Sequence, residues 1–323
     1  MEMNDFYQAA LDGTLRSSEN GDEGTLVITN DTSVHLDIFW IDGRGDHAGF
    51  NERTGYWGAG YPGTRLDPDG GQLMVDTYAG HVWLARVSAS GAFAAVFEMG
   101  DRRRQLTTLS GADLLDPNDI GEVPMPSRTK VIPPDGPRIL VGTGKLPIGN
   151  TVSREQFWQR QPESYSIAPG QTKTVTYTAT SGTQESSSNE ETVNKSVSAS
   201  VSAGWGPISA SVSAALSTSS TTSQQVTVTT QSTSFVSNEY ENKNDYPEML
   251  LFWQLVDVVT VFDSGGNPLS SIVSGTQPVV ISGPWNVDEI KKPPLEPAVV
   301  REVGNRPTLA SLEPAPDSVR ANG

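Results

Sequence analysis

Few side chains in this sequence belong to the types that usually carry out catalysis. The chain has 323 residues, no cysteine and three histidines, His35, His47 and His81. No histidine stands in an HExxH zinc motif, and no serine stands in a GxSxG nucleophile motif. Asp67 and Asp69 lie close together, but Asp67-Pro68-Asp69-Gly70 has the composition of a turn. We therefore expect a protein that is not an enzyme and that uses no metal or other cofactor.

The charge balance is strongly acidic and narrows the choice of partners. With 22 basic and 38 acidic residues, the formal net charge is -16, which argues against nucleic acid, or anionic lipid reached through charge, as a partner. The N-terminus lacks the apolar core of a Sec-type signal peptide, and no stretch approaches the roughly 18 apolar residues of a membrane helix. We expect a protein made in soluble form and released to the extracellular space by lysis or an unconventional route.

Short β-branched segments separated by turns predict an all-β protein. Residues 1–23 are a leader, and residues 24–110 are expected to form a β sandwich. Its expected strands are Thr25–Thr29, Val34–Trp40, Gln72–Asp76, His81–Val87 and Ala92–Glu98.

A long glycine- and aromatic-rich loop is expected between Arg44 and Leu66. Its aromatic side chains either bind a glycan or a lipid headgroup, or simply pack the loop against the sandwich; they are Phe50, Tyr56, Trp57 and Tyr61.

Three segments of this region resemble the β domain of the von Hippel-Lindau tumour suppressor family. They are Ile28–Gly43 (ITNDTSVHLDIFWIDG), Tyr61-Pro62 and Thr77–Leu84 (TYAGHVWL). The resemblance implies a pocket that holds a hydroxyproline of an extended peptide, with ligand-binding counterparts at Tyr61, Thr77, His81 and Trp83. A hydroxyl and an imidazole can bond the proline hydroxyl, while aromatic faces pack on its ring. The alternative is that His81 and Trp83 are core residues.

The remainder of the chain divides by composition. Residues 111–149 are rich in proline and are expected to be an extended linker, residues 150–285 a second β domain, and residues 286–323 a proline-rich tail. Lys291-Lys292 in the tail is an accessible site for activating proteolysis if the tail is removed. The helical domain with which the von Hippel-Lindau family binds the ubiquitin-ligase adaptor has no counterpart in this sequence, so a role as a ubiquitin-ligase receptor is not expected.

The most informative stretch, Ser196 to Ser237, contains no Asp, Glu, Lys or Arg. Apolar residues alternate with serines on both sides of Gly204-Trp205-Gly206-Pro207, which predicts a hairpin with one apolar and one hydroxyl face. With Ala203 opposite Ile208, both arms turn the same face outward, as a membrane barrel requires. The residues expected to enter the membrane are Val197, Ala199, Val201, Ala203, Trp205, Ile208, Ala210, Val212 and Ala214.

The hairpin, flanked by long Ser/Thr-rich strands and following a separate β module, resembles aerolysin-type β-pore-forming toxins. The resemblance implies an elongated β domain with an amphipathic pre-stem hairpin at residues 190–222, tipped by Trp205 and Ile208. It further implies a cytolysin that binds a receptor on the target-cell membrane, oligomerises and inserts a barrel. The alternative is a non-lytic adhesive protein that reads proline-rich or hydroxyproline ligands.

Overall fold

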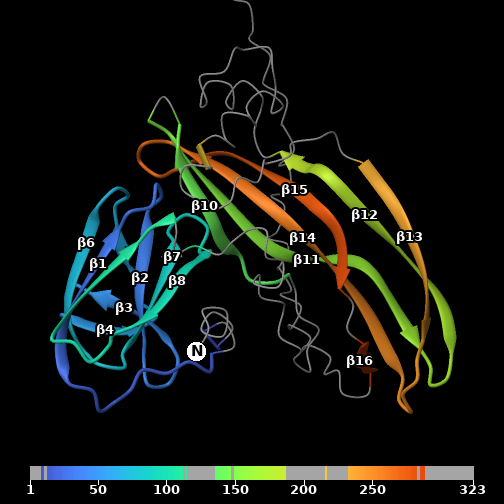
Figure 1. Cartoon of the computed structure of the whole chain (residues 1–323), viewed down its shortest axis with the longest axis horizontal. Coiled ribbons are helices and arrows are strands. Elements are labelled where there is room, and N and C mark those ends of the chain that lie inside the picture. Colours follow the sequence, from blue (N-terminus) through green and yellow to red (C-terminus); the bar gives the residue numbers. More distant parts are fainter. Residues whose placement is uncertain are drawn as a thin grey trace, which may run out of the picture. The chain divides into compact units, whose positions relative to one another are not determined.

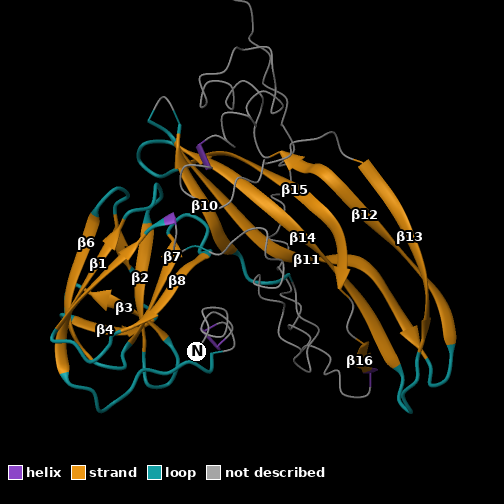
Figure 2. Cartoon of the chain, in the orientation of Figure 1, coloured by secondary structure: helices purple, strands orange, loops and turns teal. Residues whose placement is uncertain are grey.

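The computed structural model describes residues 9–10, 13–111, 114, 135–146, 149–186, 215–216, 232–281 and 284–287. Regular structure in these ranges is almost entirely β-strand (Figure 1), which confirms the predicted all-β class. Figure 2 shows the same arrangement by element type. All of the described residues lie within one compact unit. None of the described helices is long and apolar enough to cross a membrane.

The N-terminal strands form two layers. β1 (Glu23–Asn30) is the middle strand of a three-stranded sheet, antiparallel to β6 (Gly71–Tyr78) and parallel to β9 (Arg104–Leu109). In the second layer β7 (Val82–Val87) lies between β2 (Leu36–Ile41) and β8 (Phe93–Glu98). The hydrophobic core lies between the layers, because alternate side chains of β1, β2 and β7 bury there; they include Leu26, Ile28, Leu36, Ile38, Trp83 and Ala85.

The segment between Arg44 and Leu66 is not the long loop that the sequence predicts. It contains three short strands, β3 (His47–Asn51), β4 (Tyr56–Ala59) and β5 (Thr64–Leu66). β3 and β4 form a hairpin that extends the sheet beyond β2, and β5 also pairs with β2. The strands escaped prediction because each is only three to five residues long, and glycine interrupts the apolar alternation in β3 and β4.

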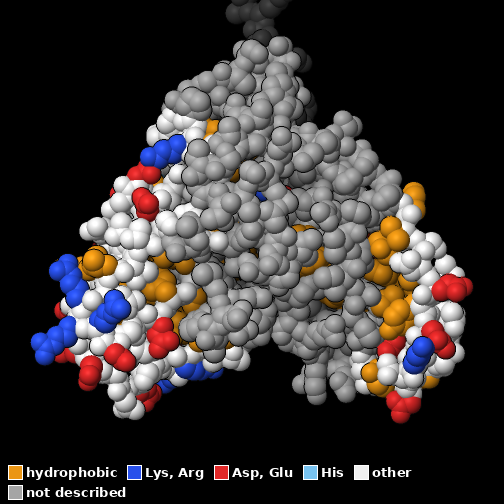
Figure 3. All heavy atoms as spheres, viewed as in Figure 1, with side chains coloured by type: hydrophobic (Ala, Val, Ile, Leu, Met, Phe, Trp, Pro, Cys, Tyr) orange, Lys and Arg blue, Asp and Glu red, His pale blue; other side chains and the backbone are white. Residues whose placement is uncertain are grey.

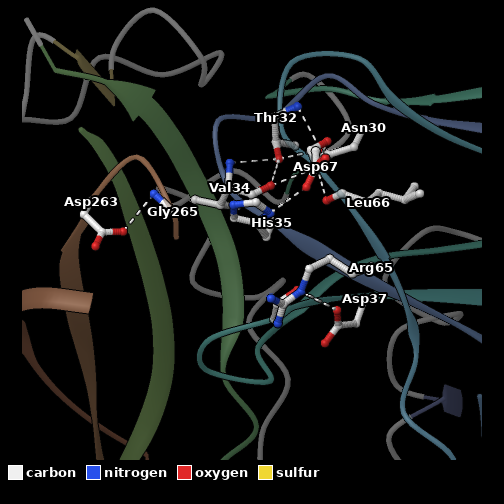
Figure 4. Close-up of polar contacts among 11 residues, drawn as sticks. Asn30, Thr32, Val34, His35, Asp37, Arg65, Leu66, Asp67, Asp263 and Gly265 are labelled. Atoms are coloured by element: carbon white, nitrogen blue, oxygen red, sulfur yellow. Dashed lines mark hydrogen bonds and ion pairs between the residues drawn. The ribbon is translucent and has the colours of Figure 1, made fainter. Parts of the chain in front are cut away.

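Asn30, buried at the end of β1, organises the crossing from one layer to the other. Its amide donates to the carbonyl oxygens of Val34 at 2.8 Å, Asp67 at 3.1 Å and Leu66 at 3.3 Å, as Figure 4 shows. Its Oδ1 accepts from the backbone N–H of Thr32 at 3.0 Å and the hydroxyl of Thr32 at 2.7 Å. One side chain thus satisfies backbone groups of two separate loops that would otherwise be buried without partners.

The C-terminal strands are longer. The order in the sheet is β13 (Ser232–Glu241), β12 (Thr172–Ser186), β15 (Pro268–Ile281), β14 (Glu248–Phe262), β11 (Thr151–Ile167) and β10 (Ile139–Lys145), with β16 (Pro284–Asn286) paired to β14. β10 lies inside the segment expected to be linker. It pairs antiparallel with β11 and touches β8 in parallel at Ile139 and Phe93, so the path of paired strands runs from β4 to β13.

A buried ion pair joins β11 to β14. The guanidinium of Arg154 meets Asp257 in two hydrogen bonds, Nη2 to Oδ2 at 2.7 Å and Nε to Oδ1 at 3.1 Å, and both side chains are buried. The fork geometry satisfies both carboxylate oxygens. Loss of one partner would leave a buried charge without compensation, at a cost of about 3–5 kcal/mol.

Several polar contacts join the N-terminal strands to this sheet. The backbone N–H of Ser33 donates to Thr143 Oγ1 at 3.3 Å, and Lys145 Nζ lies 2.8 Å from Asp69 Oδ1. The β14–β15 turn, shaped by Asp263 accepting from Gly265 (Figure 4), brings Gly266 so close to the His35 ring that a Cβ there would collide with it.

The carboxyl group of Glu155 is fully buried at this junction. Burial raises its pKa, while a 2.6 Å hydrogen bond from Ser90 Oγ and the nearby Arg138 act in the opposite direction. The folded chain therefore keeps this proton at a pH where the unfolded chain, with a glutamate pKa of about 4.3, has already lost it.

We predict that the free energy of unfolding decreases as the pH rises through the unfolded and then the folded pKa of Glu155. In Glu155→Gln, whose amide oxygen still accepts from Ser90, the part of this decrease that comes from deprotonation of Glu155 should be absent. Urea unfolding at a series of pH values from 4 to 8, about one unit apart, measures the free energy of unfolding. The exposed Glu239→Gln is the matched control and should keep the wild-type slope; equal slopes in all three proteins would contradict the prediction.

Candidate functional site

The sequence-predicted ligand residues Thr77 and His81 lie together where β6 ends and β7 begins. The intervening turn passes through Gly80 at a φ of 80°, and the Thr77 hydroxyl lies 2.9 Å from His81 Nδ1. Thr77 is buried and His81 half-buried, and burial lowers the pKa of the imidazole. At neutral pH the ring is therefore uncharged and offers one acceptor or donor nitrogen beyond the one that faces Thr77.

Two further aromatic side chains frame His81. The ring centroid of Trp40 lies 5.2 Å from that of His81, and Tyr78 meets His81 edge-on at 5.3 Å. The Trp40 indole is held by a 2.9 Å hydrogen bond from its Nε1 to Ser17 Oγ. Sequence reasoning missed Trp40, although it stands in the IFW run of the quoted resemblance and directly opposite Trp83 in the β2–β7 register.

Trp83 lies deeper than the other predicted residues. Its side chain is 2% exposed and belongs to the sandwich core, where it packs perpendicular to Trp57 with centroids 5.0 Å apart. Its Nε1 is buried without a hydrogen-bond partner among the described residues. The indole thus forms the floor behind the aromatic group, as the core alternative for this residue predicts.

Tyr61 does not join this group. It lines a surface hollow with residues of β3, the β3–β4 turn, the turn that follows β4, and β5, and the lining of that hollow includes neither Thr77 nor His81. Of the four predicted ligand residues, the structure therefore brings Thr77 and His81 into contact, buries Trp83 in the core against which Trp40 and Trp57 pack, and sets Tyr61 apart.

The predicted membrane hairpin can be located only by its flanks. All nine residues expected to enter the membrane, from Val197 to Ala214, lie outside the described residues, as does most of the predicted pre-stem 190–222. β12 and β13, which precede and follow the segment, pair antiparallel with Thr172 opposite Glu241 and Ser181 opposite Ser232. The segment 187–231 therefore leaves and re-enters the fold at two adjacent strands.

The paired strands β12 and β13 have two distinct faces. Val175 and Tyr177 of β12 and Val236 and Tyr240 of β13 pack with Ile167 and Phe252 in one cluster. On the opposite parity, Phe235 is 82% exposed. Figure 3 shows hydrophobic side chains at the surface in the region of these two strands. β13 ends the path of paired strands, so its outer edge has no strand partner within the described part of the chain.

Two residues of the predicted pre-stem are described, and both are buried. Ala215 and Leu216 pack against Val152, Val259 and Val261 of the sheet. The backbone at Ala215 comes so close to β10 that a Cβ at Gly144 would collide with the Ala215 carbonyl oxygen. The glycine at position 144 is thus the feature that allows this segment to dock.

No protein-family model matches the chain, and a search of the curated proteins finds no similar sequence. Among solved structures the chain is similar to the crystal structure of Cry35Ab1, over 66% of this chain and 65% of that chain. The sequence identity is 9% and the TM-score 0.36. The match spans just under two thirds of that chain, and a TM-score of this size does not establish a shared fold.

We predict that His81 makes stability depend on pH. Because its folded pKa lies below the ordinary value, its contribution is complete above about pH 6.5 and decreases as the pH falls through that value toward the folded pKa. His81→Asn retains a polar atom toward Thr77 but cannot titrate. Its melting temperature should therefore change less between pH 7 and pH 5 than that of the unmodified protein. Thr77→Val should lower stability by about 1 kcal/mol at pH 7 through loss of the hydrogen bond. An unchanged pH profile in His81→Asn would contradict the assignment.

A second prediction concerns Gly144. Gly144→Ala forces the backbone at Ala215 to move, so we expect Leu216 to lose its packing and proteases to cleave within 187–231 several-fold faster. Limited proteolysis followed by mass spectrometry locates the cut. Gly100→Ala is the control, because its Cβ would meet only the Gln105 side chain at 3.4 Å. Equal cleavage rates in both variants would refute the role of Gly144.

Proposed function

We propose that the protein is a pore-forming cytolysin. Its N-terminal strands bind a receptor on a target surface, copies of the chain assemble into a ring, and the 190–222 hairpin of each copy completes a transmembrane β-barrel. The chain itself catalyses no reaction. It reaches the membrane of the target cell from the extracellular space.

The antiparallel pairing of β12 with β13 is the observation that carries this proposal. A barrel stave needs two adjacent strands joined by a segment that can cross the membrane, and these two strands bracket the uncharged stretch. If their register continued into the inserted hairpin, Gly206 would stand opposite Pro207. That point falls inside the Gly204–Pro207 turn that the sequence predicts.

Side-chain parity supports the same continuation. In β12 the odd-numbered Val175 and Tyr177 share a face with the even-numbered Val236 and Tyr240 of β13. In the hairpin the apolar residues are also odd-numbered before the turn and even-numbered after it. The β12–β13 register pairs odd with even residues, so a continuous ribbon keeps its apolar side chains on one face and its serines on the other.

The length of the hairpin explains why a ring is needed. Ser196 to Ala203 alternates without interruption, and at about 3.3 Å per residue its arm spans roughly 27 Å, close to the apolar band of about 25 Å. Half of the apolar positions are alanine, so one copy gains little from lipid. A ring in which every edge is paired removes the backbone groups that would otherwise lack partners. The outer edge of β13, beside the exposed Phe235, is where a second copy can pair.

A non-lytic binding function is the second candidate. The Thr77–His81 pair, framed by Trp40 and Tyr78, offers a neutral imidazole and a hydroxyl next to aromatic faces. This chemistry suits a proline-rich or hydroxyproline-bearing peptide. In a cytolysin the same group would belong to the receptor-binding part, so dye release separates the two candidates.

We expect purified protein, with or without limited proteolysis, to release trapped dye from liposomes or cells and to form rings visible by electron microscopy. The chain has no cysteine, so single cysteines can be introduced at will. A lipid-sensitive fluorophore on Val201→Cys should respond on insertion, and one on Ser198→Cys, on the opposite face, should not. Absence of release and of rings under all conditions would refute pore formation, and an equal response at both positions would refute the two-faced hairpin.

Paired cysteines determine the register of the inserted hairpin. Continuation of the β12–β13 register places Val201 opposite Val212, whereas the turn predicted from sequence places it opposite Ala210. Disulfide formation needs Cβ atoms about 3.8 Å apart. We expect membrane-bound Val201→Cys/Val212→Cys to cross-link faster than Val201→Cys/Ala210→Cys; the reverse order would show that the register shifts on insertion.

A further inference from the structure

A surface hollow beside the β3–β4 hairpin has the size and lining of a small-molecule site. Its volume is about 530 Å³, within the range of about 300–1,000 Å³ common for such sites. The turn after β4 supplies Tyr61 and Pro62, the β3 end supplies Phe50 and Asn51, and Arg53 and Arg65 complete the charged part of its lining. None of these residues belongs to the predicted membrane hairpin or to the group formed by Thr77, His81, Trp40 and Tyr78.

The aromatic wall of the hollow is held in place by close backbone approaches. The Tyr61 ring lies directly over Gly58, where a Cβ would come within 3.2 Å of a ring carbon. At Gly49 of β3, a Cβ would collide with the carbonyl oxygens of Tyr61 and Pro62. Tyr61 is nevertheless 45% exposed. The hairpin therefore presents a fixed aromatic face to solvent, which lowers the entropy cost of binding a flat ligand.

The hollow also carries positive charge on an otherwise acidic protein. Arg53 and Arg65 line it together with one acid, Glu52, whereas the whole chain has a net charge of -16. Arg65 is oriented by Asp37, with Nε 3.6 Å from Oδ1, and Asp37 in turn accepts a 2.6 Å hydrogen bond from Ser88. Figure 4 shows the guanidinium of Arg65 beside Asp37. This pairing uses Nε and leaves the terminal nitrogens of the fork as donors.

An aromatic face next to two guanidinium groups selects a ligand that has an apolar ring face and an anionic group. Arginine binds carboxylates through paired hydrogen bonds, and an aromatic ring offers a flat surface to the C–H face of a pyranose. An extended anionic membrane is a poorer fit, because the remainder of the acidic surface would be repelled by it. On the face that Figure 3 shows, acidic and basic side chains are interspersed over the N-terminal strands.

We propose that the hollow lined by Phe50, Arg53, Tyr61 and Arg65 binds an acidic saccharide, a pyranose that carries a carboxylate. Tyr61 stacks on the sugar ring, and Arg53 and Arg65 bind the carboxylate. The inference rests on the proposed function in one respect, since such a saccharide would belong to the receptor on the target surface. Binding itself requires neither a ring nor a membrane.

Isothermal titration of the full chain with hyaluronan tetrasaccharide, which contains glucuronate, tests the proposal directly. Chitotetraose, of similar size but uncharged, is the matched ligand. We expect binding of the first and at least tenfold weaker binding of the second, and an affinity for hyaluronan that decreases as salt is raised. Arg53→Gln, Arg65→Gln and Tyr61→Ala should each weaken binding about tenfold or more, consistent with lost charge-assisted bonds and stacking.

Tyr56→Ala is the matched control, because Tyr56 is 75% exposed on the same hairpin and lies outside the lining. It should bind like the unmodified protein, and circular dichroism should show that all four variants are folded. Arg53→Gln keeps the test valid if loss of the Arg65–Asp37 pair unfolds the domain. Equal affinity for both saccharides, no binding of hyaluronan, or an equal effect of Tyr56→Ala would overturn the proposal.

Vesicles of phosphatidylcholine with and without phosphatidylglycerol separate a lipid phosphate from a saccharide carboxylate. Binding to the anionic vesicles that Arg53→Gln abolishes, without binding to hyaluronan, would overturn the saccharide assignment. Dye release is measured separately. Release without saccharide binding would refute only the hollow as a saccharide site, and saccharide binding without release would refute only pore formation.

Discussion

The antiparallel pairing of β12 with β13 is the constraint on which the proposed function depends. Ten residue pairs, from Thr172–Glu241 to Ser181–Ser232, hold the two strands in one register. Because side chains alternate along a strand, that register decides which residues of any continuation share a face. The uncharged stretch obeys the same parity. A one-residue offset would have put its serines where Val175 and Tyr177 put their apolar groups, and the ribbon would then have had no consistent lipid face.

β10 connects the N-terminal strands to the sheet that ends in the paired strands β12 and β13. It touches β8 in parallel and pairs with β11, so the sheet that carries Trp40 and Trp83 is continuous with the sheet that ends in β13. Its neighbour β11 carries Glu155, buried beside Ser90, and Arg154, bound to Asp257. Buried polar groups of this kind tolerate little displacement, because each lost hydrogen bond leaves a desolvated group without a partner. The junction is therefore expected to behave as a rigid connection.

The sequence predicted best where one physical signal dominated. Short β-branched segments bounded by turns located β1, β2, β6, β7 and β8. The strands β3, β4 and β5 were missed because each is only three to five residues long, and glycines in β3 and β4 remove side chains that would carry the pattern. β10 fell within the predicted linker, because prolines on both sides give its surroundings the composition of an extended segment. Trp40 was missed for another reason. Its place beside His81 depends on the pairing of β2 with β7, and the sequence of one strand does not specify which distant strand it pairs with.

The alanine content of the hairpin decides which force would drive insertion. A methyl-sized group gains on the order of 0.8 kcal/mol on leaving water, whereas each unsatisfied backbone group in hydrocarbon costs several kcal/mol. Apolar burial by Val197, Ala199, Val201 and Ala203 therefore cannot offset the open strand edges of a single copy. Edge pairing between copies must come first, and insertion then requires Leu216 to leave its packing against Val259 and Val261. A receptor that concentrates copies on a surface would favour the first step, and the docked Leu216 would oppose insertion until the ring has formed.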